Sequence, residues 1–145
     1  MPDVFPALTT LVISAFTSAT LLPGTSEAVL VGLHLTNAAP AWLLVVTASL
    51  ANVAGSCINW VMGRFLVHYA DRRWFPVNEV QIDRAAAWYR RYGWVTLFAS
   101  WMPVVGDPLT VVAGFLRTPF WLFILVVAFA KTARYATLVW LIDLI

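Results

Sequence analysis

The sequence predicts an all-α integral membrane protein built as an inverted-topology repeat, and three observations carry this prediction. Hydrophobic residues make up 61% of the 145-residue chain and charged residues only 11%, whereas a soluble domain carries about a quarter charged residues. The apolar character continues to Ile145, so we do not expect a signal peptide followed by a soluble body. The two halves also repeat the same motif, a proline followed four residues later by an acid. We therefore expect a single membrane domain over residues 1–145.

The first element is an apolar stretch, residues 7–22, that is followed by Pro23, Gly24 and then Glu27. A Pro-Gly pair is a turn signal. The stretch after it, residues 27–37, has 11 residues and reaches only about halfway through a bilayer at about 1.5 Å per residue. These features predict a re-entrant helical hairpin that turns at Pro23 and Gly24. A complete crossing by residues 7–22 is the alternative, and it would break the topology proposed below.

A full crossing and then a basic segment follow the hairpin. Residues 38–65 are long enough to span the membrane. Residues 68–92 hold five of the nine Lys and Arg residues, so we expect this segment to be cytoplasmic and both termini to lie on the other side. Asn78 followed by Gln81 predicts a helix start. The segment after it is expected to be an amphipathic helix at the membrane surface or a short solvated linker helix. The residues at helical spacing on its apolar face are Ile82, Ala85, Ala86, Tyr89 and Tyr92.

The second half repeats this plan. Residues 94–102 form a short apolar arm of nine residues, Pro103 to Gly106 are the turn, and residues 107–117 are the second arm of 11 residues. Residues 118–142 are long enough for one crossing. The same pattern of a re-entrant hairpin followed by one transmembrane helix therefore occurs twice.

The order and spacing of the matches indicate an internal duplication. The matched pairs, at offsets of 79 or 80, are Pro23 with Pro103, Glu27 with Asp107, Pro40–Leu43 with Pro119–Leu122, Asn52 with Lys131, and Trp60 with Trp140. Repeat 1 then covers about 7–66, the linker and amphipathic helix 67–92, and repeat 2 93–145. One crossing per half starts the second half on the opposite side, so the hairpins enter from opposite faces and their tips meet near the midplane.

Four side chains are expected to share that depth. Glu27 and Asp107 lie in the first turn of each second arm, and Asn52 and Lys131 each lie 12 residues beyond their repeat prolines, which is about 18 Å of helix. Arg134 is one turn beyond Lys131 on the same face. Desolvation favours the neutral form of each acid, whereas a helix start and nearby cations favour the ionised form, so the acids are suited to proton exchange.

Intramembrane ionisable residues are candidate functional sites by default. The alternative is that Glu27 and Asp107 form buried ion pairs with Lys131 and Arg134 that only hold the hairpins together. Asn52 and Asn59 are expected to be supporting interhelical hydrogen bonders rather than ligand contacts. The remaining candidate charge partners are Arg64 and Arg117.

These motifs resemble the DedA family, the bacterial members of the VTT-domain superfamily, and most closely its small YqaA branch. The resemblance covers nearly the whole chain, and the stretches that carry it are SATLLPGTSE, GRF, SWMPVVGD, Ala113-Gly114 and AKTARY. It implies a bacterial inner-membrane protein with two opposed re-entrant hairpins. The family includes proton-dependent lipid transporters or scramblases, among them flippases for undecaprenyl phosphate. Family members carry arginines beside the second-hairpin proline, whereas this chain has Ser100 and Gly106 there, which counts against a phosphate headgroup.

Two functional hypotheses remain open. In the first, the protein is a transporter or a lipid scramblase or flippase, coupled to protons through Glu27 and Asp107. Its partners would be membrane lipids, a lipid phosphate among them, bound with the help of Lys131 and Arg134. In the second, the protein is a non-transporting membrane-homeostasis or assembly factor with structural charges. An enzyme ranks last because the sequence has no Ser/His/Asp arrangement, metal cluster or phosphate loop. We expect no cofactor, metal or nucleic acid, and a homo-oligomer stays open.

Overall fold

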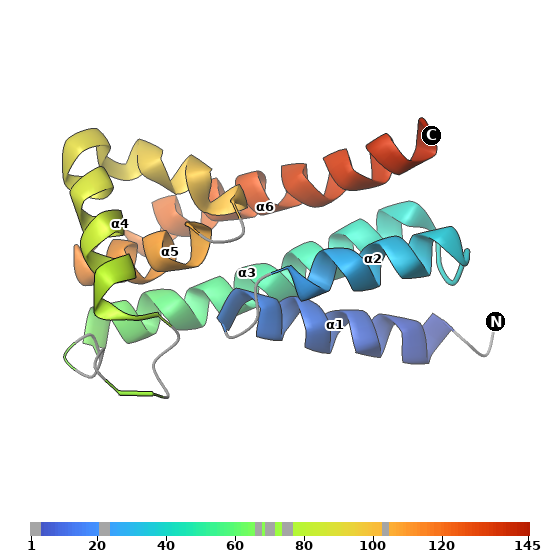
Figure 1. The fold of residues 1–145 in the computed structure, drawn as a ribbon, viewed down its shortest axis with the longest axis horizontal. Coiled ribbons are helices and arrows are strands. Elements are labelled where there is room, and N and C mark those ends of the chain that lie inside the picture. The colour runs from blue at the N-terminus through green and yellow to red at the C-terminus, as the bar shows by residue number, and fades with distance from the viewer. Residues whose placement is uncertain (1–3, 21–23, 66–67, 69–71, 74–76, 103–104) are drawn as a thin grey trace.

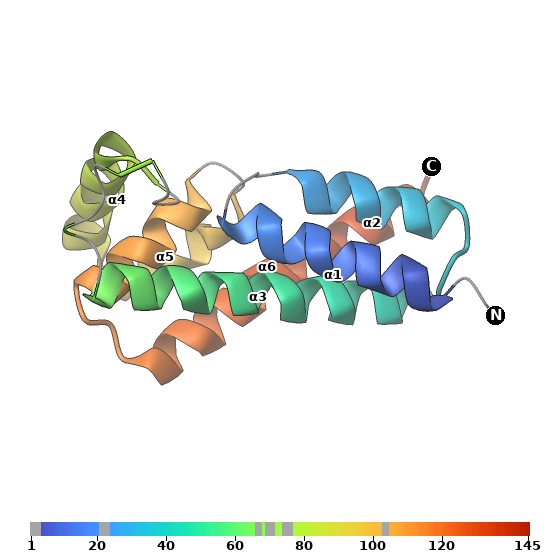
Figure 2. The same cartoon turned by 90° about the horizontal axis from the view of Figure 1, so that it is seen from below.

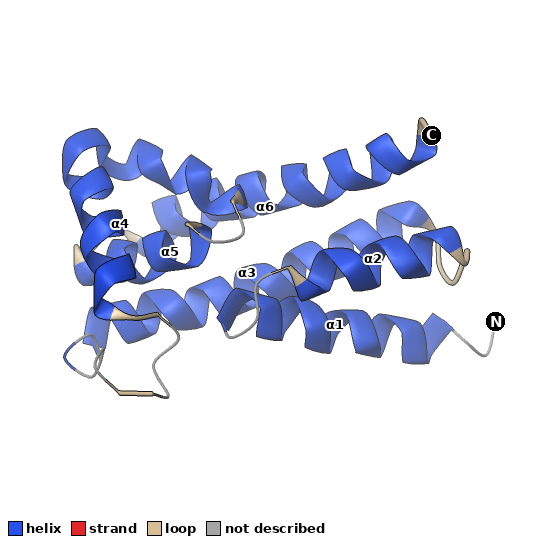
Figure 3. Cartoon of the chain, viewed as in Figure 1, coloured by secondary structure: helices blue, strands red, loops and turns tan. Residues whose placement is uncertain are grey.

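The structure, a computed structural model, describes residues 4–20, 24–65, 68, 72–73, 77–102 and 105–145. This part of the chain contains helices and no strand (Figure 3). The elements are α1 (Val4–Thr20), α2 (Thr25–Leu35), α3 (Ala41–Phe65), α4 (Glu79–Tyr92), the 3₁₀ helix η2 (Gly93–Trp101), α5 (Gly106–Phe115) and α6 (Phe120–Asp143). The predicted all-α class is therefore confirmed. The predicted turn residues Pro23 and Pro103 lie outside the described residues.

Two helices, α3 with 25 residues and α6 with 24, are long and apolar enough to cross a membrane. Their outward faces carry large apolar side chains that are mostly exposed, among them Leu50, Trp121, Leu125 and Phe129, each 67% exposed or more. A water-soluble monomer rarely leaves such a continuous apolar surface open. The length and the exposed surface together indicate helices that face lipid.

The inner face of α3 consists of small and polar residues, which recur at helical spacing. They are Ala48, Asn52, Gly55, Ser56, Asn59 and Gly63, all buried. Small residues allow helix backbones to approach closely, and polar ones form hydrogen bonds between helices where lipid offers none. This stripe explains why α3 lies at the centre of the molecule, in contact with α1, α5 and α6.

Apart from α4, the helices alternate in direction along one long axis (Figures 1 and 2). The pair α1 and α2 enters from the end that carries both termini, and the pair η2 and α5 enters from the opposite end (Figure 1). The end of α1, the start of α2 and the start of α5 all lie toward the middle of the long axis. The α1 helix has 17 residues and η2 has nine, so the first arms of the two pairs differ in length.

The α4 helix lies across the end of the bundle where α3 ends (Figure 1). Its predicted start is confirmed, because the Asn78 side chain accepts a hydrogen bond from the Gln81 backbone and the Gln81 side chain accepts one from the Asn78 backbone. Ile82, Ala85 and Ala86 of the predicted apolar face are buried against α5 residues such as Leu109, so the protein itself covers part of the face that was expected to lie at the membrane surface. Tyr92 is instead 59% exposed, because the helix ends at this residue and the chain turns into η2.

Candidate functional site

The structure brings the four predicted charged residues together from three helices. Asp107 forms an ion pair with Lys131 at 3.5 Å, and Glu27 forms one with Arg134 at 2.5 Å. The side chain of Lys131 is 2% exposed and that of Arg134 10%, while the two acids are 18% and 20% exposed. Two acids and two bases balance, so the network adds no net charge to the apolar interior.

Each acid lies at the start of a short helix that has no side-chain cap. The α2 helix begins after Gly24, whose φ of 91° places it in the left-handed region, and the α5 helix begins after Val105. Glu27 and Asp107 are in the first turns, where the free backbone N–H groups and the helix dipole favour a negative charge. Gly24 therefore explains the turn before α2, and the positive end of each helix explains why an acid is stable in its first turn.

Lys131 is held by both halves of the chain. Its ammonium donates a hydrogen bond to Asn52 Oδ1 and faces Asp107. The Asn52 amide in turn donates to the Ala15 carbonyl of α1 at 2.9 Å. Asn52 therefore does more than the ordinary interhelical bonding expected from the sequence, since it also solvates the buried ammonium. One side chain thus links α1, α3 and α6.

Arg134 lies one turn further along α6 and borders a groove. Its guanidinium also donates to the Trp101 carbonyl at 2.9 Å, while its buried Nε has no partner among the described residues. A cavity of about 600 Å³ opens beside it between η2 and α6. Apart from Arg134 and Thr137 the lining is apolar, with Phe98, Trp101, Phe129, Ala130, Ala133, Leu138 and Leu141. A single cation at the edge of an apolar groove suits an amphiphile with an anionic group.

Other polar contacts around the network were not expected from the sequence. Tyr135, completely buried, hydrogen-bonds Ser26 at 2.8 Å and so ties the first turn of α2 to α6. Thr110 donates to the Asp107 carbonyl at 2.7 Å and accepts from Asn59 at 3.2 Å. Ser26 could have been picked out from the sequence because it is next to Glu27. Tyr135 could not, because the sequence of an aromatic-rich helix does not show whether a tyrosine is buried or faces lipid.

Arg64 and Arg117 lie apart from the acids. Ten residues of chain, mostly helix α5, separate Arg117 from Asp107, a distance of about 15 Å at the helical rise. Arg64 is at the end of α3 beside Gly114, and the Arg117 backbone bonds the Gly114 carbonyl at 3.1 Å. The two arginines therefore share the α4 end of the molecule, and the candidate site has only Lys131 and Arg134 as its described cations.

Ser100 and Gly106, where the resemblance leads one to expect arginines, lie in close contact. A Cβ atom added to Gly106 would overlap the Ser100 carbonyl, because the end of η2 and the start of α5 approach closely. Ser100 is itself 1% exposed. A long side chain at position 106 therefore requires the two arms to separate.

The comparisons with known proteins agree with the membrane character of the fold. The model of the VTT domain matches residues 22–144. The chain belongs to the VTT-domain (DedA) family. It is 42% identical over 129 residues to the inner membrane protein YqaA of Escherichia coli strain K12 and to that of Shigella flexneri, covering 89% of this chain and 86% of each relative. No solved structure matches the sequence.

A third relative extends the comparison. An uncharacterized protein of Haemophilus influenzae is 33% identical over 139 residues, covering 89% of this chain and 83% of the relative. Two named relatives of this VTT-domain chain are inner membrane proteins, which supports a bacterial inner-membrane location. Among the described residues, no three His, Cys, Asp or Glu side chains lie close enough to hold a metal ion.

Proposed function

We propose that this VTT-domain protein moves lipids across the inner membrane, with Glu27 and Asp107 as proton-coupling groups. The observation that carries the proposal is the network of two acids, at the starts of α2 and α5, and two bases on α6, with Arg134 at the edge of an apolar groove. A charged side chain in the bilayer costs about 2.5–3.5 kcal/mol on insertion scales. Because four such side chains in one network are costly, we infer that the network has a function, which is the exchange of protons.

The proposed membrane arrangement has α3 and α6 crossing the bilayer and two re-entrant hairpins, α1–α2 and η2–α5, that enter from opposite faces. Three features support it. The hairpins come from opposite ends of the molecule (Figure 1). The short second arms have 11 and 10 residues. The repeat partners Asn52 and Lys131 bond to each other, as expected for equivalent positions that meet near a pseudo-two-fold axis.

In this mechanism the lipid chain lies in the η2–α6 groove and its anionic group approaches Arg134. The incoming anion competes with Glu27 for the guanidinium. A carboxylate that loses its cation at low dielectric favours its protonated form, so arrival of the anion is coupled to uptake of a proton. Asp107 and Lys131, both in the second half, form the other acid–base pair of the network. With serine and glycine in place of the family arginines, a singly charged headgroup suits the site better than a diphosphate.

The test is lipid transport by the purified protein in liposomes, measured for a panel of lipids with and without a pH gradient. We expect Glu27→Gln and Asp107→Asn each to abolish transport while the protein still inserts and folds. Glu27→Asp and Asp107→Glu should retain part of the activity, because they keep a titratable group. Transport that is the same in the amide variants as in the wild type would rule out the coupling role.

The second candidate function is a membrane-homeostasis or assembly role with purely structural charges. The observation in its favour is that both acids are already paired. On this hypothesis, Asp107→Asn leaves Lys131 unpaired in the interior and destabilises the protein by about 3–5 kcal/mol. The deciding variant is Asp107→Asn with Lys131→Met. If it restores both yield and function, the charges are structural and the coupling mechanism fails.

The proposed orientation places residues 68–92 in the cytoplasm. Seven of the nine Lys and Arg residues lie between Arg64 and Arg117, and none precedes Arg64, which favours retention of this region inside. A cysteine at Asp83, in a Cys57→Ser background, should react with a membrane-impermeant reagent only from the cytoplasmic side. Cysteines near the two termini should react only from the periplasmic side. Labelling of the two ends from different sides would show that the number of crossings is wrong.

A further inference from the structure

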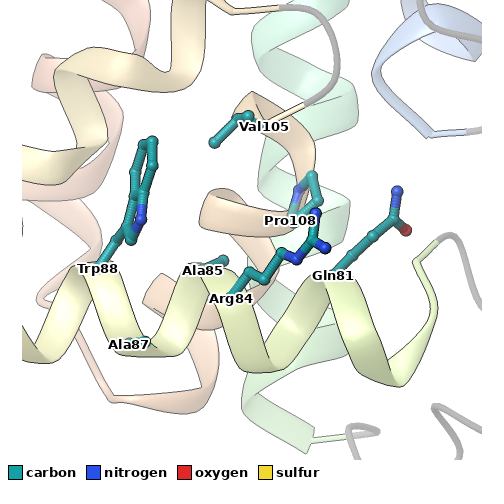
Figure 4. A pocket seen from close by; sticks show the side chains of 7 residues that line it. All are labelled: Gln81, Arg84, Ala85, Ala87, Trp88, Val105 and Pro108. Carbon is teal, nitrogen blue, oxygen red and sulfur yellow. The ribbon is translucent and has the colours of Figure 1, made fainter.

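A second cavity, separate from the charge network, lies between α4 and the start of α5. Its volume is about 300 Å³. The residues that line it are Gln81, Arg84, Ala85, Ala87, Trp88, Val105 and Pro108. Figure 4 shows Gln81, Arg84 and Trp88 projecting from α4 toward the side of α5 that carries Val105 and Pro108. The cavity therefore has a largely apolar lining, with the polar side chains of Gln81 and Arg84 on its α4 wall.

The Arg84 guanidinium is available to a ligand. Arg84 is exposed, and no described carboxylate lies within 4.0 Å of it. Its planar fork matches the oxygen atoms of a phosphate, and such charge-assisted hydrogen bonds are the strong ones. The Gln81 amide, three residues away on the same helix, supplies a further donor for a hydroxyl or an ester oxygen. The α4 side of the cavity therefore suits a ligand that carries an anionic group next to a less polar part.

The surroundings place this cavity at the level of lipid headgroups. The α4 helix lies across the end of the bundle, roughly perpendicular to α3 (Figure 1). Trp88 and Trp94 are 46% and 45% exposed at this end, and tryptophan is enriched at membrane–water interfaces. Residues 68–92 carry five arginines against three acids, which attracts anionic lipids to the surface.

We propose that the α4–α5 cavity binds the headgroup and glycerol region of an anionic phospholipid. The phosphate contacts Arg84, the polar linkage contacts Gln81, and the first methylenes pack against Ala85, Val105 and Trp88. A zwitterionic headgroup fits less well, because its ammonium group lies close to the same arginine. This assignment does not depend on the transport proposal, since neither Glu27 nor the η2–α6 groove takes part.

Occupancy of the cavity acts on the charge network through α5. Pro108 lines the cavity and directly follows Asp107, which pairs with Lys131. A lipid that packs on Val105 and Pro108 therefore stabilises the first turn of α5 and the position of the acid. The cavity is a site through which the anionic lipid content of the membrane sets the state of the network.

The experiment is a titration of the purified full-length protein with phosphatidylglycerol or phosphatidylcholine in detergent, read by native mass spectrometry. We expect one phosphatidylglycerol to bind at least about tenfold more tightly than phosphatidylcholine. Arg84→Gln should weaken phosphatidylglycerol binding about tenfold, which is the effect of losing one hydrogen bond to a charged group. Arg91→Gln is the matched control, because it makes the same charge change on the same helix outside the cavity, and it should change binding by less than about twofold.

Three outcomes would overturn the proposal. Equal weakening by Arg84→Gln and Arg91→Gln would show attraction to surface charge without a site. Equal binding of the two lipids would show that the cavity takes an acyl chain and not a headgroup. Unchanged phosphatidylglycerol binding in both Arg84→Gln and Trp88→Ala would show that the lipid binds elsewhere. Gel filtration and circular dichroism check that each variant is folded, and Arg84→Lys should retain part of the affinity because it keeps the charge without the fork.

Discussion

The second arms of the two hairpins pack in different ways on the long helix of the other half. The α5 arm contacts α3 backbone to backbone, since a Cβ added to Gly63 would overlap the Val111 carbonyl and one added to Gly114 would overlap the Trp60 carbonyl. The α2 arm instead reaches α6 through side chains, with His34 bonded to Asp143 at 2.7 Å. The α3–α5 interface is closest at these glycines and adds one side-chain hydrogen bond, from Asn59 to Thr110. Three side-chain pairs bridge the α2–α6 interface, namely His34–Asp143, Ser26–Tyr135 and Glu27–Arg134.

The two contacts occupy corresponding places in the repeat. Adding the offset of 80 to Gly63 gives Asp143, and subtracting it from Gly114 gives His34. The same point of the predicted duplication is therefore a glycine contact in one half and a polar pair in the other. Close-packed backbones do not slide without losing their contacts, whereas a partly exposed side-chain pair breaks and re-forms at little cost. We therefore expect the α2–α6 side to open at its His34 end and the α3–α5 side to stay closed.

The largest effect is expected at the glycine contact. Gly114→Ala should lower the free energy of unfolding by about 1–3 kcal/mol, because the added methyl group forces α3 and α5 apart. Gly114→Leu should abolish the yield of folded protein. Gly32→Ala is the matched control, since a Cβ at Gly32 meets nothing within 4 Å and alanine is the better helix former. Thermal unfolding of the detergent-purified protein gives the comparison, and a Gly114→Ala protein as stable as Gly32→Ala would show that the helices are not in close contact.

An effect smaller than that of Gly114→Leu is expected where the halves meet at Asn52. This amide solvates the buried Lys131 ammonium, whereas Asn59, about two turns further along α3, donates to two uncharged partners among the described residues, the Ala19 carbonyl and Thr110. Both asparagines are buried, at 1% and 0% exposure. Asn52→Leu should cost about 1.5–3 kcal/mol and Asn59→Leu about 1 kcal/mol, because hydrogen bonds to charged groups contribute more than neutral ones.

The stabilities of the Asn52→Leu and Asn59→Leu variants are measured by chemical or thermal unfolding under the same conditions. Adding Lys131→Met to each variant completes a double-mutant cycle. We expect a coupling energy between positions 52 and 131 and none between 59 and 131. Equal costs for the two asparagines would contradict the role of Asn52 as the partner of a charge.

The sequence carries enough information for the helices and for the depth of the charged residues. Predominantly apolar segments of more than twenty residues form α3 and α6, and a proline with an acid four residues later marks the starts of α2 and α5. The shared spacing of Asn52 and Lys131 from their repeat prolines predicts that they lie at one level, and in the structure they bond to each other. These features follow from the spacing of the repeated residues, the lengths of the apolar segments and the residues at the turns.

The pairings and the cavities could not be predicted in the same way. Lys131 and Arg134 lie one turn apart on α6, so which base meets which acid depends on how far each hairpin reaches along that helix. The α4–α5 cavity depends on the docking angle of α4, which periodicity does not encode. His34 and Asp143 are ordinary polar residues at helix ends, and only the fold brings them to 2.7 Å. The transport role of the acids stays a prediction.

The smallest effect on stability, and the sharpest test of the comparison, concerns His34 and Asp143. The Asp143 side chain is 59% exposed, and exposed ion pairs contribute about 0–1 kcal/mol. Asp143→Asn should therefore leave the unfolding temperature nearly unchanged, and salt should reduce even this small difference.

If the α2–α6 side opens during transport, however, cross-linking positions 34 and 143 should stop the transport cycle without affecting the fold. With cysteines at both positions in a Cys57→Ser background, a bifunctional methanethiosulfonate should lower lipid transport in liposomes at least about tenfold, and a reducing agent should restore it. The single-cysteine variants treated with the same reagent control for simple modification. Undiminished transport by the cross-linked protein would show that α2 and α6 stay together throughout, and that the polar pair is as fixed as the glycine contact.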